Sequence, residues 1–155
     1  KNLILNITKS EIFLYEQRLD DALKDINKVL NISPKNYPAS IIKSKILSAQ
    51  KETIKAEEIL RDLLINKNRD PSLWLQLSEV QRAGKNIIGY HLSRGEDLML
   101  LGDFENALNQ FKCALGLSNN SFQTSEPIMT KIKLEQEKHG AKRGVELKMC
   151  SWGGC

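Results

Sequence analysis

The sequence predicts an all-α fold of about eight antiparallel helices, and three observations lead to that prediction. Apolar residues recur at the three- and four-residue spacing of amphipathic helices along most of the chain. The composition agrees, because 41% hydrophobic and 27% charged residues with only 6% aromatics are typical of a folded helical protein. Part of the apolar pattern repeats, as from Ala22 to Ala56, at the period of about 34 residues that indicates stacked helix pairs.

Proline, glycine and capping residues mark the helix boundaries. Pro34 stops the second helix, because proline has no amide hydrogen with which to continue it. Asp70 and Pro71 fit the N-cap and the first turn of the fifth helix, and Gly84 fits its end. The expected helices cover residues 3–16, 19–30, 38–50, 53–65, 71–83, 86–101, 104–115 and 126–138.

The repeat slips by half a period in the second half of the chain. The step from Ala22 to Ala56 is one full period, whereas the step from Ala56 to Ala107 is one and a half periods. We therefore expect the helix over 86–101 to serve twice, as partner of the helix before it and of the helix after it. This places one inserted half-repeat in the stack.

Residues 89–115 resemble one tetratricopeptide (TPR) repeat. That family places a small residue where two helices cross, a Gly-x-aromatic turn, and an alanine, an aromatic and a second alanine on the second helix, since small residues permit close helix packing. In residues 89–115 these places hold Gly95, Gly102, Phe104, Ala107, Phe111 and Ala114. Two weaker copies upstream have alanine at the first alanine place, namely Ala22 and Ala56. The resemblance implies a TPR-like right-handed superhelix.

More narrowly, residues 74–138 resemble the C-terminal TPR region of the BepA-like periplasmic zinc metalloproteases, which assist outer-membrane protein assembly. The order is a helix with Trp74, a Tyr-His-Leu-Ser-Arg-Gly-Glu helix, a Gly-Asp-Phe turn, an Ala-rich helix and a closing helix. The resemblance implies an accessory domain attached to a zinc-protease domain. The chain departs from the family at Pro127, which would have to lie in the first turn of the last helix. Residues 1–140 form the expected repeat domain, and residues 141–155 a tail that is either non-native or disordered.

No catalytic residue, metal site or cofactor is expected in this chain. A zinc protease needs two histidines one helical turn apart, whereas His91 and His139 stand far apart in the sequence. We expect His91 to be a satisfied core or edge histidine, His139 a helix-end cation and Cys113 a small buried residue. No phosphate loop and no serine nucleophile arrangement can be assembled either. Enzymatic activity would therefore belong only to a full-length zinc metalloprotease.

The charge distribution, the apolar runs and the cysteines limit the kinds of partner and environment that the sequence predicts. The net charge of +4 comes from interleaved acidic and basic residues, which argues against a nucleic-acid partner. No apolar run reaches the roughly 18 residues of a membrane-spanning helix. Cys150 and Cys155 stand close enough in sequence for a disulfide, and the sequence leaves their state open.

The expected function is a protein-protein interaction scaffold that binds a peptide segment or a neighbouring domain in a concave groove. In the TPR family the first helix of each pair lines that groove. Carrying those positions over gives Ile7, Glu11, Tyr15, Lys45, Leu75, Glu79, Arg82, Leu92, Glu96 and Met99. If the metalloprotease resemblance holds, the protein is periplasmic and its partners are the protease domain of the same polypeptide and envelope assembly proteins. The alternative is a free-standing TPR adaptor, which would be cytoplasmic.

Overall fold

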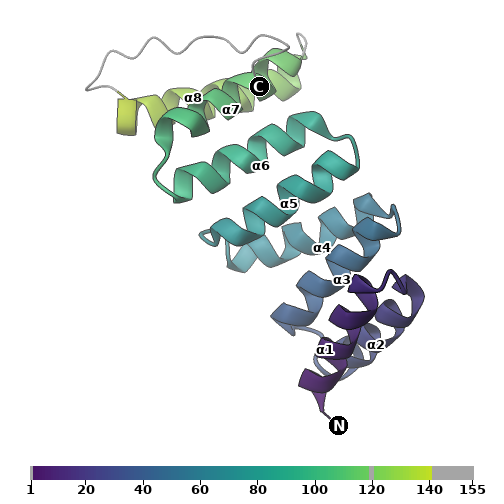
Figure 1. Ribbon diagram of the computed structural model, residues 1–155. Helices are drawn as coiled ribbons and strands as arrows, with labels where there is room; N and C mark the ends of the chain where they lie inside the picture. The colour runs from purple at the N-terminus through teal and green to yellow at the C-terminus, as the bar shows by residue number, and fades with distance from the viewer. Residues whose placement is uncertain (1, 119–120, 141–155) are drawn as a thin grey trace. The chain divides into compact units, whose positions relative to one another are not determined.

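The computed structural model describes residues 2–118 and 121–140, and this part of the chain is all-α (Figure 1). Its eight α-helices and one π-helical turn are α1 Leu3–Tyr15, α2 Leu19–Ile32, α3 Tyr37–Ala49, α4 Thr53–Asn66, α5 Pro71–Ala83, α6 Ile87–Leu100, α7 Phe104–Leu117, α8 Phe122–Glu135 and η1 Gln136–Gly140. The contacts divide the chain into two compact units, Lys1–Lys67 and Asn68–Cys155. Neighbouring helices within each unit pack as hairpins, so the predicted all-α helical repeat is confirmed.

Four helix connections adopt the same short turn. The middle residues Gln17, Lys51, Lys85 and Gly102 have φ values of 61°, 68°, 61° and 82°. The amide of the residue that follows bonds a carbonyl of the preceding helix, as from Arg18 to the Phe13 oxygen at 2.8 Å, which closes the helix end. The first three turns are one repeat period apart, and the last follows half a period later.

The half-repeat appears in these turns, because α6 has one at each end. Helix α6 packs against both α5 and α7, and it therefore serves twice, as the sequence predicts. Gly84 is the C-cap of α5, as predicted, with φ −82°, and the left-handed residue of the turn is the next one, Lys85. The turn repeats by position, and a lysine occupies the place where glycine would be least strained.

These turns give a testable contrast between Lys85 and Gly102. A left-handed backbone costs a residue with a Cβ about 1 kcal/mol or more and costs glycine nothing sterically. We therefore expect Lys85→Gly to raise the free energy of unfolding by up to about 1 kcal/mol and Gly102→Ala to lower it by about 1 kcal/mol. Urea denaturation followed by circular dichroism measures both. Equal midpoints for the two variants would contradict the assignment of this backbone conformation.

The core of the first unit lies between α2 and α3. It consists of almost fully buried residues, namely Ala22, Ile26, Val29, Ala39, Ile42 and Ile46. Helix α1 packs beside this cluster, and its buried Ser10 donates a hydrogen bond from its hydroxyl to the Asn6 carbonyl at 2.8 Å. Ser44, one repeat period later, is buried in the same way and donates to the Ile41 carbonyl at 2.7 Å. Small hydroxyl residues whose polar atom is satisfied locally let the helices approach closely.

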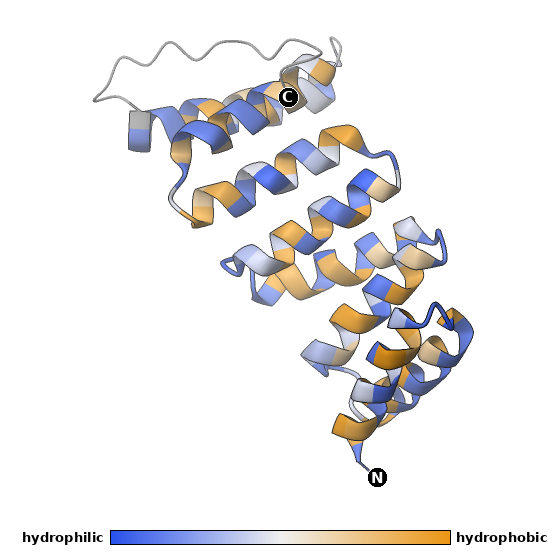
Figure 2. Cartoon of the chain, viewed as in Figure 1, coloured by the Kyte–Doolittle hydropathy of each residue, from blue (hydrophilic) through white to orange (hydrophobic). Residues whose placement is uncertain are grey.

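The core of the second unit joins α7 to α8. Its buried residues are Ala107, Leu108, Phe111, Ala114, Ile128 and Ile132, and partly buried residues of α6 pack against them. At the start of the unit, Trp74 donates its indole N–H to the Asn68 carbonyl at 2.8 Å and so fixes the loop before α5. Figure 2 shows how hydrophobic and hydrophilic residues alternate along the helices, as expected for elements with one buried face.

The last helix differs from the prediction. Helix α8 begins at Phe122 rather than at residue 126, so Pro127 lies inside the helix and not in its first turn. The Ser121 carbonyl accepts hydrogen bonds from the amides of Thr124 and Ser125 at 3.0 and 2.8 Å, which starts the helix early. At the sixth helical position a proline removes one backbone hydrogen bond and costs the helix about 3 kcal/mol, unlike a proline in the first turn. The expectations for residues 141–155, including Cys150 and Cys155, fall outside the described residues.

Candidate protein-interaction surface

The predicted groove residues of the first unit lie on α1 and α3. Glu11 and Lys45 are one repeat period apart, occupy equivalent places on the two helices and are both exposed. Within residues 2–118 and 121–140 neither has an ion-pair partner. Tyr15 is 90% exposed, whereas Ile7 packs against the core of the unit. The first unit therefore exposes two opposite charges without an ion-pair partner among the described residues, Glu11 and Lys45, and one aromatic ring, Tyr15.

Helix α5 carries the corresponding residues of the second unit. Leu75, Glu79 and Arg82 follow the i, i+4, i+7 spacing of one helix face, and Leu75 is 41% exposed. Arg82 and Glu79 form an exposed ion pair with a nitrogen-to-oxygen distance of 3.2 Å. An exposed pair of this kind contributes little to stability, so its charges are accessible to a partner.

The three predicted groove residues of α6 are engaged inside the second unit. Leu92 and Met99 pack against the core of α7 and α8. The Glu96 carboxylate lies 2.5 Å from Nζ of Lys131 on α8, and that nitrogen is 5.2 Å from the ring centroid of Phe111. Helix α8 thus occupies the side of α6 on which a partner was expected.

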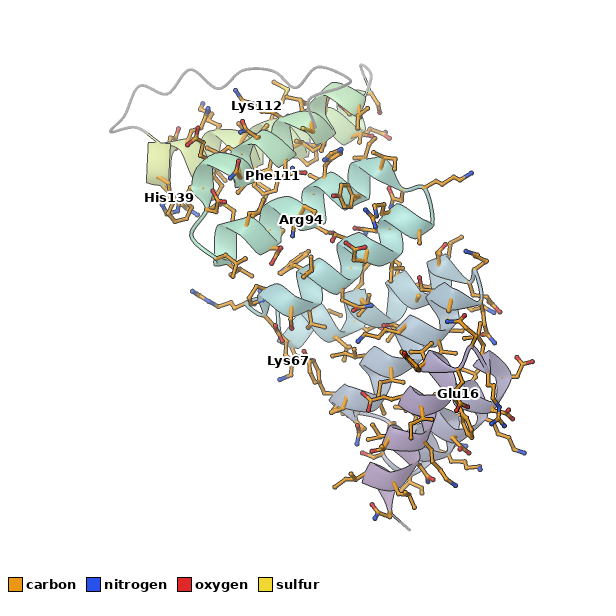
Figure 3. All side chains as sticks on the ribbon, in the orientation of Figure 1. Glu16, Lys67, Arg94, Phe111, Lys112 and His139 are labelled. Carbon is orange, nitrogen blue, oxygen red and sulfur yellow. The ribbon has the colours of Figure 1, made fainter. Side chains whose placement is uncertain are left out.

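The residues of the repeat signature mark helix crossings rather than a surface. Ala22, Ala56, Ala107, Phe111 and Ala114 are all 0% exposed. Gly95 on α6 lies against the ring of Phe111, because a Cβ at Gly95 would meet three atoms of that ring. Figure 3 labels Phe111 on α7. Phe104, by contrast, is 36% exposed, and its ring stacks on that of His139 with centroids 4.0 Å apart.

Of the buried polar side chains of α6, His91 was expected, whereas Ser93 and Asp97 were not. Ser93 donates its hydroxyl hydrogen to Gln81 Oε1 at 2.6 Å, which ties α6 to α5. His91 Nδ1 lies 2.7 Å from Gln110 Oε1, which ties α6 to α7 and agrees with the expected satisfied histidine. Among the described side chains no buried nitrogen or oxygen lacks a hydrogen-bond partner. The doubly packed helix is therefore fixed by hydrogen bonds on both sides.

An ion pair completes this polar set. The side chains of Arg94 and Asp97 pair one helical turn apart, and the Asp97 side chain is only 4% exposed. Burial raises the pKa of the Asp97 carboxyl above its ordinary value, although the positive charge of Arg94 acts in the opposite direction. The sequence did contain a signal for it. Arg94 and Asp97 take the places at which other second helices have apolar residues, Ile26 and Val29 in α2 and Phe111 and Ala114 in α7.

The described residues offer little that could bind a small ligand. In residues 2–118 and 121–140 no group of three histidine, cysteine or carboxylate side chains is placed to hold a metal ion. A shallow hollow of about 670 Å³ lies beside the turns that follow α1 and α3, lined by Gln17, Leu19, Asp20, Leu23, Gln50 and Glu52. Gln50 donates to Asp20 Oδ1 across it at 3.1 Å, so these polar groups satisfy one another.

Cys113 on α7 is buried, as expected, at 3% exposed. The helices of the described ranges are each too short or too polar to cross a bilayer.

Comparison with protein-family models and with curated proteins gave no match for this sequence. The fold and the surface together define an all-α helix-hairpin repeat protein whose first helices expose charged and aromatic side chains.

Proposed function

We propose that this chain is a protein-protein interaction scaffold that binds a peptide segment or a neighbouring domain along its first helices. The observation that carries the proposal is the surface of α1 and α3. There Glu11 and Lys45 are exposed and have no partner among the described residues, and Tyr15 stands 90% exposed beside them. Burying an exposed tyrosine ring at a protein interface is a common source of binding energy.

The chemistry of these positions indicates the kind of ligand. Unpaired charges of both signs favour a ligand with both acidic and basic groups, since each finds an opposite charge on the surface. Tyr15 supplies an apolar anchor on the first unit, and the half-exposed Leu75 supplies one on the second unit. An extended or helical segment with an apolar side chain between opposite charges fits the surface of either unit.

Two substitutions test this proposal. Peptides that bind the purified chain are selected from a displayed random library, and calorimetry then gives their affinities for variants. We expect Tyr15→Ala and Arg82→Glu to weaken binding about tenfold each, since each removes an exposed anchor or reverses a charge. Circular dichroism and the urea midpoint stay unchanged because both side chains are exposed. Ile54→Ala is the matched control, because Ile54 is 75% exposed on α4, a second helix that carries none of the predicted groove residues. Unchanged affinity in both test variants would refute the proposal.

We infer, more narrowly, that the chain is the accessory C-terminal TPR domain of a larger envelope metalloprotease and chaperone involved in outer-membrane protein assembly. The support is the order of helices over 74–138 and the two successive tight turns at Lys85 and Gly102. In that setting the partners are the protease domain of the same polypeptide and envelope assembly proteins, in the periplasm. Proline within α8 is the main departure from that family.

The full reading frame that contains this sequence decides between two alternatives, a domain of a metalloprotease and a free-standing TPR adaptor. A preceding helix with a His-Glu-x-x-His motif supports the metalloprotease, because that spacing places two zinc ligands on one helix face. A frame without it leaves the free-standing TPR adaptor. A pull-down from envelope extract with the full chain, compared with its Tyr15→Ala variant, then identifies the proteins retained through this surface.

A further inference from the structure

One side of α6 corresponds to the proposed partner-binding side of α5. Leu92, Glu96 and Met99 form this side, and we name it the α6 binding face. Half a repeat period earlier, the corresponding residues of α5 are Leu75, Glu79 and Arg82. The α5 residues are exposed, whereas those of α6 are partly buried, because they pack against the core that α7 shares with α8 or pair with α8. An element of the same chain therefore covers on α6 the positions that are open to a partner on α5.

Helix α8 holds the α6 binding face through few side chains. Ile128 and Ile132 are 4% and 7% exposed and belong to the shared core. Between them, Nζ of Lys131 lies 2.5 Å from the Glu96 carboxylate. Two apolar anchors one helical turn apart and a cation beside them are what a bound amphipathic helix offers to a groove. The contact thus has the chemistry of a ligand that belongs to the same chain.

Helix α8 is also the least secured helix of the second unit. The N-cap side chains of α5, α6 and α7 accept a hydrogen bond from a helix amide, whereas that of Ser121 accepts none from an amide of α8. Pro127 lies inside α8 and cannot donate the backbone hydrogen bond of its position. Of the described side chains of α8 only Ile128 and Ile132 are buried, although α5, α6 and α7 bury five residues each. A helix with so few buried contacts opens more readily than its neighbours.

We propose that α8 is an exchangeable cover, which occupies the α6 binding face until an amphipathic helix of a partner protein takes its place. The partner helix has apolar residues at positions i and i+4 and a basic residue at i+3, as α8 has in Ile128, Ile132 and Lys131. The basic residue is needed because Glu96 loses its cation when α8 leaves. The inference rests on the proposed function, since it adds regulation by α8 to the α6 part of the same interaction surface.

The cover can be tested without any change in the α6 binding face itself. A ligand that requires the open form binds with an affinity reduced by the fraction of molecules that are open. Lys131→Glu removes the cation and places a like charge beside Glu96, so it raises the open fraction. Pro127→Ala restores the missing backbone hydrogen bond and lowers the open fraction. The two substitutions in α8 therefore change the affinity for an added helix in opposite directions.

The test uses a synthetic peptide of residues 121–136 that carries Pro127→Ala and a fluorophore. A hydrocarbon staple between the exposed positions 129 and 133 holds it helical, because an isolated helix of this length is marginal in water. Fluorescence anisotropy with the wild-type full chain is expected to give a Kd of about 100 µM. We expect binding at least about tenfold tighter to the Lys131→Glu chain and at least about tenfold weaker to the Pro127→Ala chain. Ile132→Ala, which removes one apolar anchor, is a second opening variant.

Lys133→Glu is the matched control. It makes the same charge change on α8, at an exposed lysine without an ion-pair partner among the described residues, and should leave the affinity unchanged. Circular dichroism confirms that each variant is folded, and the comparison of Pro127→Ala with wild type decides if both opening variants fail to fold. Equal affinity for wild type and all three test variants overturns the proposal, as does no binding to either folded opening variant up to about 1 mM. An increase with Lys133→Glu as large as that with Lys131→Glu also overturns it.

The result is separable from the test of the proposed function. Tyr15→Ala changes α1 and should leave the affinity for the α8 peptide unchanged. Peptide exchange without any effect of Tyr15→Ala or Arg82→Glu on the selected peptides would refute only the surface of α1, α3 and α5. The opposite pair of results would refute only the cover.

Discussion

Replacing Gly95 by alanine is expected to lower the free energy of unfolding by about 3 kcal/mol. A Cβ at this position of α6 would lie 2.6 Å from Cδ1 and 2.7 Å from Cζ of Phe111. Phe111 is 0% exposed and sits in the core of the second unit, so its ring cannot move aside without opening that core. Urea denaturation followed by circular dichroism measures the loss.

Two further variants isolate the cause. Gly116→Ala is the matched control on α7, because a Cβ there meets nothing within 4 Å and alanine favours a helix by about 0.5–1 kcal/mol over glycine. It should therefore stabilise the protein. Gly95→Ala combined with Phe111→Leu should be less destabilised than the sum of the two single changes, since the smaller side chain removes the clash. Additive losses in the double variant would show that the contact with Phe111 is not responsible.

The repeat itself explains why glycine stands at this place. Ser10 and Ser44 occupy the same place in the first two helix pairs, and each precedes an aliphatic residue of the second helix, Ile26 or Leu60, by the same sequence separation. Gly95 precedes Phe111 by that separation as well. A larger ring on the second helix therefore goes with a smaller residue on the first. This coupling can be predicted from sequence, because type and spacing change together.

Other parts of the fold could be predicted for similar reasons. Pro34 and Asp70 act locally, through a missing amide hydrogen and a side-chain cap, so they place helix ends without reference to the rest of the chain. The double role of α6 follows from the alanine spacing alone. The start of α8 could not be placed, because a proline is typical of a first helical turn and Pro127 lies inside the helix instead.

The candidate surface was less predictable than the fold. Assigning Leu92, Glu96 and Met99 to a groove assumed that the same helix face is free in every pair. Helix α8 engages that side of α6, with Lys131 bound to Glu96. Which face of a helix remains free depends on the elements packed against it, and the sequence period of one helix carries no information on them. On α1, α3 and α5 the assignment stays a prediction, whereas on α6 the predicted residues are engaged by the core and by α8.

Replacing Arg94 by methionine is expected to lower the free energy of unfolding by about 2 kcal/mol at pH 7 and much less at pH 3.5. Methionine keeps much of the length of the side chain but removes the positive charge beside the Asp97 carboxylate, which is 4% exposed. Burial already raises the pKa of Asp97, and loss of the Arg94 charge raises this pKa further. The folded protein then binds a proton at pH values where the unfolded chain has lost it.

The sign of the pH dependence follows from that proton. Where the folded state binds more protons than the unfolded state, the free energy of unfolding falls as the pH rises. The deficit of Arg94→Met relative to wild type should therefore be small below the unfolded pKa, near 3.8, and grow as the pH rises through the folded pKa. Arg94→Met combined with Asp97→Asn is the control, because asparagine does not titrate, and its difference from Asp97→Asn alone should be the same at both pH values. A deficit of Arg94→Met that does not change between pH 3.5 and 7 would mean that the arginine acts through packing of its methylene groups, and that the charge of Asp97 costs the fold nothing.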